Sequence, residues 1–147
     1  MIILDTNVLS ALMQSRPDCE VVAWLDQQDP ASVWLTTVTL FEARYGIALL
    51  ADGKRKQQLR QQLEQMISDI LQHRVLGLDV AAAKAAATLA AERKQRGQPV
   101  DMRDTFIAGI ALAHRATLAT RNVRHFADVG VAVINPWANS IDDDRTV

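Results

Sequence analysis

Short apolar runs alternate with longer helical stretches along this chain. The runs lie at residues 2–4, 33–36, 75–78, 117–120 and 131–134. Their nearly continuous apolar character is typical of strands that are buried on both faces of a parallel sheet. The stretches between them predict helices at residues 8–13, 21–28, 40–50, 54–72, 80–96 and 101–115. The chain is therefore expected to alternate between strand and helix.

The stretch at residues 54–72 has the clearest amphipathic pattern, with apolar positions at helical spacing and Gln, Lys and Arg on the other face. The apolar positions are Leu59, Leu63, Met66, Ile67 and Ile70. Strands separated by helices predict the α/β class. We expect one three-layer α/β/α domain over residues 1–137, with a central parallel sheet of four to five strands. Residues 138–147 are expected to form a flexible C-terminal tail.

Composition narrows the class of protein. The 147 residues are 49% hydrophobic and 22% charged, which suits one globular domain. A formal net charge of −1 argues against a protein that coats DNA, so any contact with nucleic acid needs a local basic patch. The single cysteine, Cys19, excludes an internal disulfide. With neither a signal-peptide pattern nor a long apolar run, a soluble cytoplasmic protein with no membrane contact is expected.

Polar residues follow several of the predicted strands. Asp5 ends the first strand, Glu42 lies shortly after the second, and Thr120, Arg121 and Asn122 follow a later one. Ligands of open parallel sheets bind beyond the carboxyl ends of the strands. These side chains are therefore expected to converge at one edge of the sheet.

Glu42 lies beside an apolar stripe on its predicted helix, which is formed by Val38, Phe41, Tyr45 and Leu49. We expect this stripe to face the core. A carboxylate next to a core is costly unless it is paired or bound to a metal ion. An ion pair between Glu42 and Arg44 is the alternative explanation.

Asp104 and Asp5 each have a structural explanation as well. Asp101 and Asp104 have the spacing of a helix cap and an acid in the first turn. Asp104 also shares a face with Ile107 and Ala108, which turns it inward, so Asp101 can be the cap and Asp104 a ligand. Asp5 can cap the helix that follows it.

Three carboxylates at one edge repel one another unless a cation lies between them. Hard oxygen ligands favour Mg²⁺ or Mn²⁺ over zinc. Such an ion can activate a water molecule for hydrolysis of a phosphodiester bond. The chain has no glycine-rich nucleotide loop and no G-x-S-x-G motif, which leaves cofactor-binding and serine-hydrolase classes without their signatures.

Five segments carry a family resemblance: MIILDTN at residues 1–7, TLFEARYG around Glu42, RDTFIAG around Asp104, ATRN at residues 119–122 and the closing INPW. In this order and spacing they resemble the PIN-domain ribonucleases, in particular the VapC- and FitB-like toxins of type II toxin–antitoxin pairs. The resemblance covers residues 1–137. It places the ligands of Mg²⁺ or Mn²⁺ on Asp5, Glu42 and Asp104.

The resemblance also implies a function and partners. It implies an endoribonuclease toxin that cleaves RNA with a metal-activated water, leaving a 5′-phosphate and a 3′-hydroxyl. It implies a homodimer that is inhibited by a small cognate antitoxin, whose C-terminal segment enters the active-site groove. Operator DNA would be bound only indirectly, through the antitoxin.

The sequence departs from the family at a fourth acid. Asn122 and His125 stand where relatives carry Asp, which leaves open whether one metal ion or two are bound. Asn122 can still offer a carbonyl oxygen. Thr6 and Thr120 are expected to hydrogen-bond a ligand carboxylate or the scissile phosphate.

Arg121 and Arg124 are candidates for contacts with RNA phosphates. Two alternatives remain open. The first is a non-catalytic binding module that acts within an antitoxin–DNA complex. The second is a phosphate-handling hydrolase with Asp5 as its nucleophile, although the D-x-D motif expected after the strand is missing.

Overall fold

A computed structural model describes residues 1–138 and shows one five-stranded parallel sheet in the order β3-β2-β1-β4-β5. The strands are β1 (Ile2–Leu4), β2 (Val33–Thr36), β3 (Val75–Leu76), β4 (Thr117–Ala119) and β5 (Val133–Ile134). β1 lies in the centre, where Ile3 is paired with Trp34 of β2 and Leu118 of β4. The predicted α/β class and parallel sheet are confirmed.

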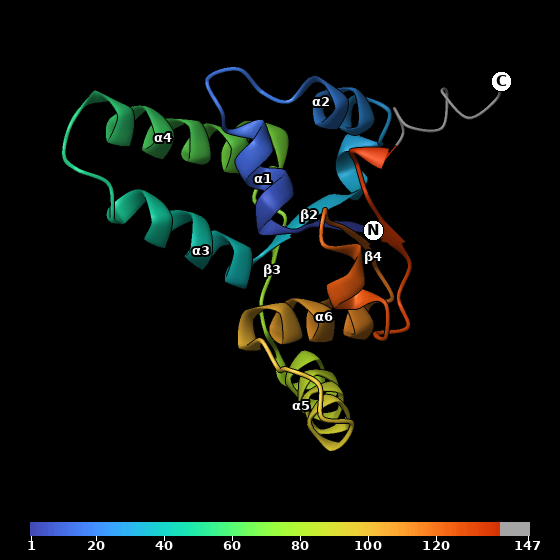
Figure 1. Ribbon diagram of the computed structural model, residues 1–147. Helices are drawn as coiled ribbons and strands as arrows, with labels where there is room; N and C mark the ends of the chain where they lie inside the picture. Colours follow the sequence, from blue (N-terminus) through green and yellow to red (C-terminus); the bar gives the residue numbers. More distant parts are fainter. Residues whose placement is uncertain (139–147) are drawn as a thin grey trace, which may run out of the picture.

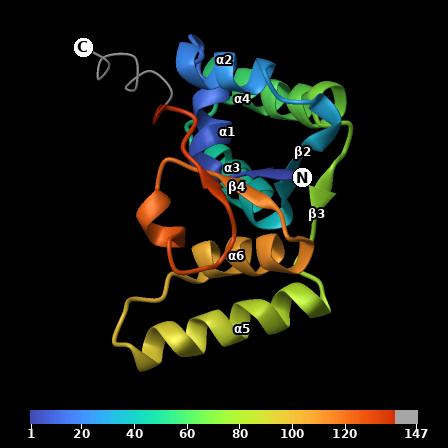
Figure 2. The same ribbon diagram turned by 90° about the vertical axis from the view of Figure 1, so that its right-hand side faces the viewer.

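Helices cover both faces of this sheet (Figure 1). They are α1 (Thr6–Leu12), α2 (Cys19–Asp26), α3 (Thr37–Ala48), α4 (Lys54–Gln65), α5 (Val80–Gln95) and α6 (Met102–His114). There are also short 3₁₀ turns, η1 (Pro30–Ser32) before β2 and η3 (Val123–Phe126) between β4 and β5. Helices α1 to α4 lie on one side of the sheet and α6 on the other. Figures 1 and 2 place α5 beyond α6, on the side away from the sheet.

The core consists of two apolar clusters, one on each face of the sheet. Successive side chains of a strand point to opposite faces. Leu4 accordingly joins the cluster under α1 and α2, whereas Ile3 joins the cluster under α6. This double burial explains why the strands are continuously apolar.

The helix predicted at residues 54–72 ends early. The α-helix α4 stops at Gln65, and η2 (Met66–Ile70) continues as one wide π-turn in which the Leu71 N–H donates to the Met66 carbonyl. Gln72 then has a left-handed backbone with φ of 47°. The turn leads the chain back into β3. The spacing of apolar residues did not indicate that the α-helix ends at Gln65.

The predicted buried face of α3 is wrong. Phe41, Tyr45 and Leu49 are 59%, 53% and 68% exposed, and the rings of Phe41 and Tyr45 stack on the surface with centroids 5.7 Å apart. The helix instead buries Thr39 and Ile47. Helix α3 carries apolar residues on more than one of its own faces. Their spacing therefore did not identify the face that packs against α1 and α4.

Helices α5 and α6 approach each other closely at Gly109. A Cβ atom at Gly109 would lie 2.5 Å from the Ala82 carbonyl oxygen and 2.7 Å from the Ala86 Cβ. The alanine-rich face of α5 and this glycine therefore set the distance between the two helices.

No helix within residues 1–138 has the length and apolar character needed to cross a membrane. The tail predicted at residues 138–147 lies, from residue 139 onward, outside the described part of the chain.

Candidate active site

Asp5 lies where the central strand β1 ends, and it is buried. One carboxylate oxygen accepts a hydrogen bond from the Thr6 backbone N–H at 2.8 Å. Asp5 is thus the N-cap of α1, as predicted. The other carboxylate oxygen accepts from the Thr120 hydroxyl at 2.8 Å and from the Asn7 amide at 3.3 Å. Asp5 therefore caps the helix and is also held in place by the residue that follows β4.

Burial raises the pKa of the Asp5 carboxyl above its ordinary value. The hydrogen bonds from Thr120 and Thr6 and the nearby His125 oppose this rise, whereas the charge of Asp104 adds to it. The ionised form of Asp5 is thus disfavoured by lost hydration and by a neighbouring acid. A cation in contact with this carboxylate would relieve both effects.

Glu42 lies on α3 and turns toward Asp5. The Thr6 hydroxyl donates to one carboxylate oxygen at 3.1 Å, and Arg103 of α6 approaches the other at 3.6 Å. The alternative partner Arg44 instead pairs with Glu64 of α4. Burial raises the pKa of Glu42, opposed by the Thr6 hydrogen bond and Arg103 and assisted by the charges of Asp5 and Asp104.

Asp104 lies in the first turn of α6, and Asp101 caps that helix as predicted, with the Asp104 backbone N–H donating to its side chain at 3.0 Å. The Asp104 carboxylate itself is free of this capping role. It contacts the ring Nδ1 atom of His125 at 3.1 Å. His125, in η3, therefore lies beside Asp104, and it is one of the two positions at which the resemblance implied a fourth acid.

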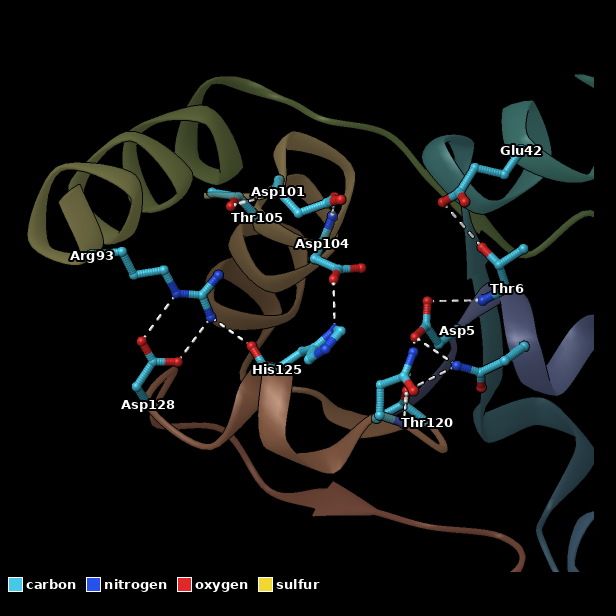
Figure 3. Close-up of polar contacts among 12 residues, drawn as sticks. Asp5, Thr6, Glu42, Arg93, Asp101, Asp104, Thr105, Thr120, His125 and Asp128 are labelled. Carbon is cyan, nitrogen blue, oxygen red and sulfur yellow. Dashed lines mark hydrogen bonds and ion pairs between the residues drawn. The ribbon is translucent and has the colours of Figure 1, made fainter. Parts of the chain in front are cut away.

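The carboxylates of Asp5, Glu42 and Asp104 face a common space beyond the carboxyl edge of the sheet (Figure 3). They come from three separate places: the junction of β1 and α1, helix α3 and helix α6. Within residues 1–138, no three His, Cys, Asp or Glu side chains lie close enough together to hold a metal ion as they stand. The donor chemistry nevertheless fits Mg²⁺ or Mn²⁺, because all three acids offer hard oxygen ligands. Burial also raises the pKa of Asp5 and Glu42, and a bound cation would favour their charged forms.

Thr120 and Asn7 form the support beneath Asp5. The buried Thr120 hydroxyl oxygen accepts from the Asn7 amide at 3.3 Å and from the Asn122 backbone N–H at 3.0 Å. The Asn7 side-chain oxygen in turn accepts from the Arg121 N–H at 3.1 Å. The segment after β4 is thus fastened to the segment after β1.

Arg121 and Asn122 lie at the rim of the site. The Arg121 guanidinium stacks over the Trp137 ring at 4.4 Å from its centroid, and the Trp137 indole N–H donates to Asp18. The Asn122 side chain is exposed. Their predicted contacts with a substrate stay predictions.

Three further residues were not identified as site residues from the sequence. Asn7 could have been identified from the sequence, since it is the last residue of the MIILDTN segment that carries the family resemblance. His125 was noted only as a replaced acid, and its contact with Asp104 depends on how η3 folds back onto α6. Arg103 opens the RDTFIAG segment, but its contact with Glu42 was not predicted, because Glu42 lies on a helix far away in the sequence.

Comparisons with known proteins show the family to which this fold and sequence belong. The family model described as the PIN domain matches residues 2–132. The chain is 39% identical to VapC ribonuclease Y4jK of Sinorhizobium fredii, covering 93% of this chain and 98% of the relative. It is 40% identical to Toxin FitB of Neisseria gonorrhoeae, with 93% and 99% covered.

A solved structure of FitAB bound to an IR36 DNA fragment superposes with a TM-score of 0.85 at 39% identity, covering 93% of this chain and 96% of that one. The similarity thus spans both the fold and the segments that carry the three acids. On this evidence the chain belongs to the PIN domain family.

Proposed function

We propose that this protein is the toxin of a type II toxin–antitoxin pair and an endoribonuclease that requires Mg²⁺ or Mn²⁺. The observation that carries the proposal is the convergence of Asp5, Glu42 and Asp104 at one sheet edge, with Asp5 and Glu42 disfavoured in their charged forms. Relatives at about 40% identity are named a ribonuclease and a toxin. The expected location is the cytoplasm, where RNA is available.

Each residue has a defined task in this proposal. Asp5, Glu42 and Asp104 would hold the cation, which when bound supplies positive charge at the scissile phosphate and lowers the pKa of water. Thr120 and Asn7 orient the Asp5 carboxylate, and Thr6 orients Glu42 while its backbone N–H also binds Asp5.

RNA would reach the site along its exposed rim. Arg121 and Arg124 are exposed and are proposed to contact phosphates. Asn122 offers an amide between them. Two local cations suit a chain with a net charge of −1, in which contacts with nucleic acid need a local basic patch.

An antitoxin is proposed to bind the groove that leads away from Glu42. This groove has a volume of about 260 Å³ and lies between α1, α3 and α4. Apolar side chains such as Met13, Ile47 and Leu59 line it, with Arg55 among them. An apolar segment from a small partner would fit this lining, and operator DNA would be bound through that partner.

The direct test of the proposed activity is incubation of the purified protein with RNA, with and without a chelator, followed by mapping of 5′ ends. We expect new 5′-phosphate ends in the presence of Mg²⁺ or Mn²⁺ and none after chelation. Accumulation of a phosphoaspartate on Asp5 would instead support the alternative hydrolase.

Replacement of Glu42 by Gln is expected to weaken Mn²⁺ binding by at least about 10-fold, because one anionic oxygen donor is lost and even groups that only support a metal ligand contribute about 10–100-fold. Isothermal titration calorimetry measures this, and Glu64→Gln on the exposed face of α4 is the matched control. Affinity should fall as the pH is lowered, since protons compete for Asp5 and Glu42 at higher pH than for ordinary carboxyls. Absence of Mn²⁺ binding, with or without RNA, would favour the non-catalytic module.

A homodimer is proposed to form through the exposed face of α3, where Phe41, Tyr45 and Leu49 would be covered by a second copy. We expect light scattering to give a dimer for the unmodified protein and a monomer after Leu49→Glu. Gln57→Glu, on the exposed side of α4, should stay dimeric. A monomeric unmodified protein would contradict the proposal.

A further inference from the structure

Arg93 is a buried cation near the end of the alanine-rich helix α5, only 6% exposed. Its Nε and Nη2 atoms donate to the two carboxylate oxygens of Asp128 at 3.0 and 2.8 Å. Nη2 also donates to the backbone carbonyl of His125 at 2.7 Å (Figure 3). One guanidinium thus joins α5 to the second half of η3, through His125, and to the residues just after it, through Asp128.

A buried guanidinium is retained only where its hydrogen bonds are satisfied, since removal from water is costly. The pairing is strong enough to hold the pKa of Asp128 below its usual range. Arg93 has no hydrogen bond to Asp5, Glu42 or the carboxylate of Asp104 within the described structure. Its hydrogen bonds all go to the segment at η3, and its positive charge also interacts with the negative charge of Asp104.

The turn at η3 is anchored at its last residue by Phe126, whose side chain is fully buried in the core under α6. It is four residues long, and no side chain caps its N-terminus. Within the turn, the His125 N–H donates to the Asn122 carbonyl at 3.0 Å, and the His125 ring reaches Asp104. The Arg93 bond to the His125 carbonyl fixes the backbone from which that ring projects.

The turn η3, which Arg93 holds, also borders the active site. A cavity of about 400 Å³ opens beside Asp104, and Arg93, His125 and Asp128 form one of its walls. Movement of η3 would therefore change both the contact with Asp104 and the shape of the space next to it.

We propose that Arg93 is a positioning residue of the nuclease, which acts through Asp128 and the His125 backbone to hold the His125 ring against Asp104. The expected effect on kcat rests on the proposed function. The expected effect on the position of the His125 ring does not. Arginine is required because its planar fork reaches two carboxylate oxygens and a carbonyl together, whereas lysine presents a single ammonium.

The test compares Arg93→Lys with Arg96→Lys. Both residues lie at the end of α5 and both pair with Asp128, but Arg96 is half-exposed and does not contact the His125 carbonyl. In Arg93→Lys we expect shifted His125 ring signals in NMR spectra and loss of the ring's NOE contacts to Asp104. We expect kcat for RNA to fall on the order of 100-fold with KM little changed, as for other small displacements at active sites.

Arg96→Lys should retain the native His125 signals and kcat. Native His125 signals in Arg93→Lys, or a kcat equal to that of Arg96→Lys, would overturn the proposal. If Arg93→Lys does not fold, Asp128→Asn weakens the same fork from its other side and leaves Arg93 in place, and native signals and kcat there would overturn the proposal too. If the unmodified protein cleaves no RNA, the proposed function fails, while the His125 signals still decide the role of Arg93.

Discussion

Replacement of Asp5 by Asn is expected to abolish RNA cleavage and the growth arrest caused by expression of the protein without its partner. Asp5 is the most buried of the three acids and the one that lies at the end of the central strand. Asparagine keeps the shape of the side chain but removes the charge that would hold a cation. Since even indirect supports of metal ligands contribute about 10–100-fold, loss of a ligand should reduce cleavage by at least that much.

The measurements are the cleavage rate with Mn²⁺ and the growth of cells that express the variant. Asp52→Asn is a matched control, because Asp52 is fully exposed and pairs only with Lys56. Thermal unfolding of both variants separates lost chemistry from lost folding. An Asp5→Asn protein that stays as toxic as the original would show that the acids at the sheet edge are not a catalytic centre.

Replacement of Gly109 by Ala is expected to lower the free energy of unfolding by about 1–3 kcal/mol, and with it Tm by several degrees. The added Cβ would collide with the Ala82 carbonyl and with Ala86, which are backbone or directly attached atoms that cannot rotate away. Helix α5 would have to move outward from α6. Denaturant titration measures the loss.

Gly46→Ala is the control for helix propensity. Gly46 also lies within a helix, but a Cβ there would meet no atom within 4 Å. Because alanine is about 0.5–1 kcal/mol more favourable than glycine inside a helix, this variant should be slightly stabilised. Equal effects of the two substitutions would contradict the close approach of α5 and α6.

The fold was largely predictable because strands buried on both faces leave continuous apolar runs. The central strand illustrates this, with Ile3 and Leu4 serving opposite cores. The orientation of α3 was not predictable. Phe41 and Tyr45 satisfy helical spacing as well as Ile47 does, and only the packing of α1 and α4 decides which side is covered.

The site was predictable where residues follow strands and unpredictable where it depends on side chains that meet across elements. The position of Asp5 followed from the end of its strand. The contact of His125 with Asp104 requires η3 to fold back onto α6, which no periodicity encodes. The role proposed for Arg93 was equally hidden, since one arginine in an alanine-rich helix is indistinguishable in sequence from a solvated one.

The central place of β1 has a consequence for the timing of synthesis. Asp5 leaves the ribosome early, yet the Thr120 hydroxyl that holds its carboxylate is 115 residues further along the chain. At ordinary elongation rates this interval lasts on the order of ten seconds. Throughout it, β1 has no β4 to pair with and the acids cannot be gathered at one edge. A growing chain of this protein is therefore expected to be harmless to the ribosome and messenger that produce it, and an incomplete chain that ends before Thr120 should be inert.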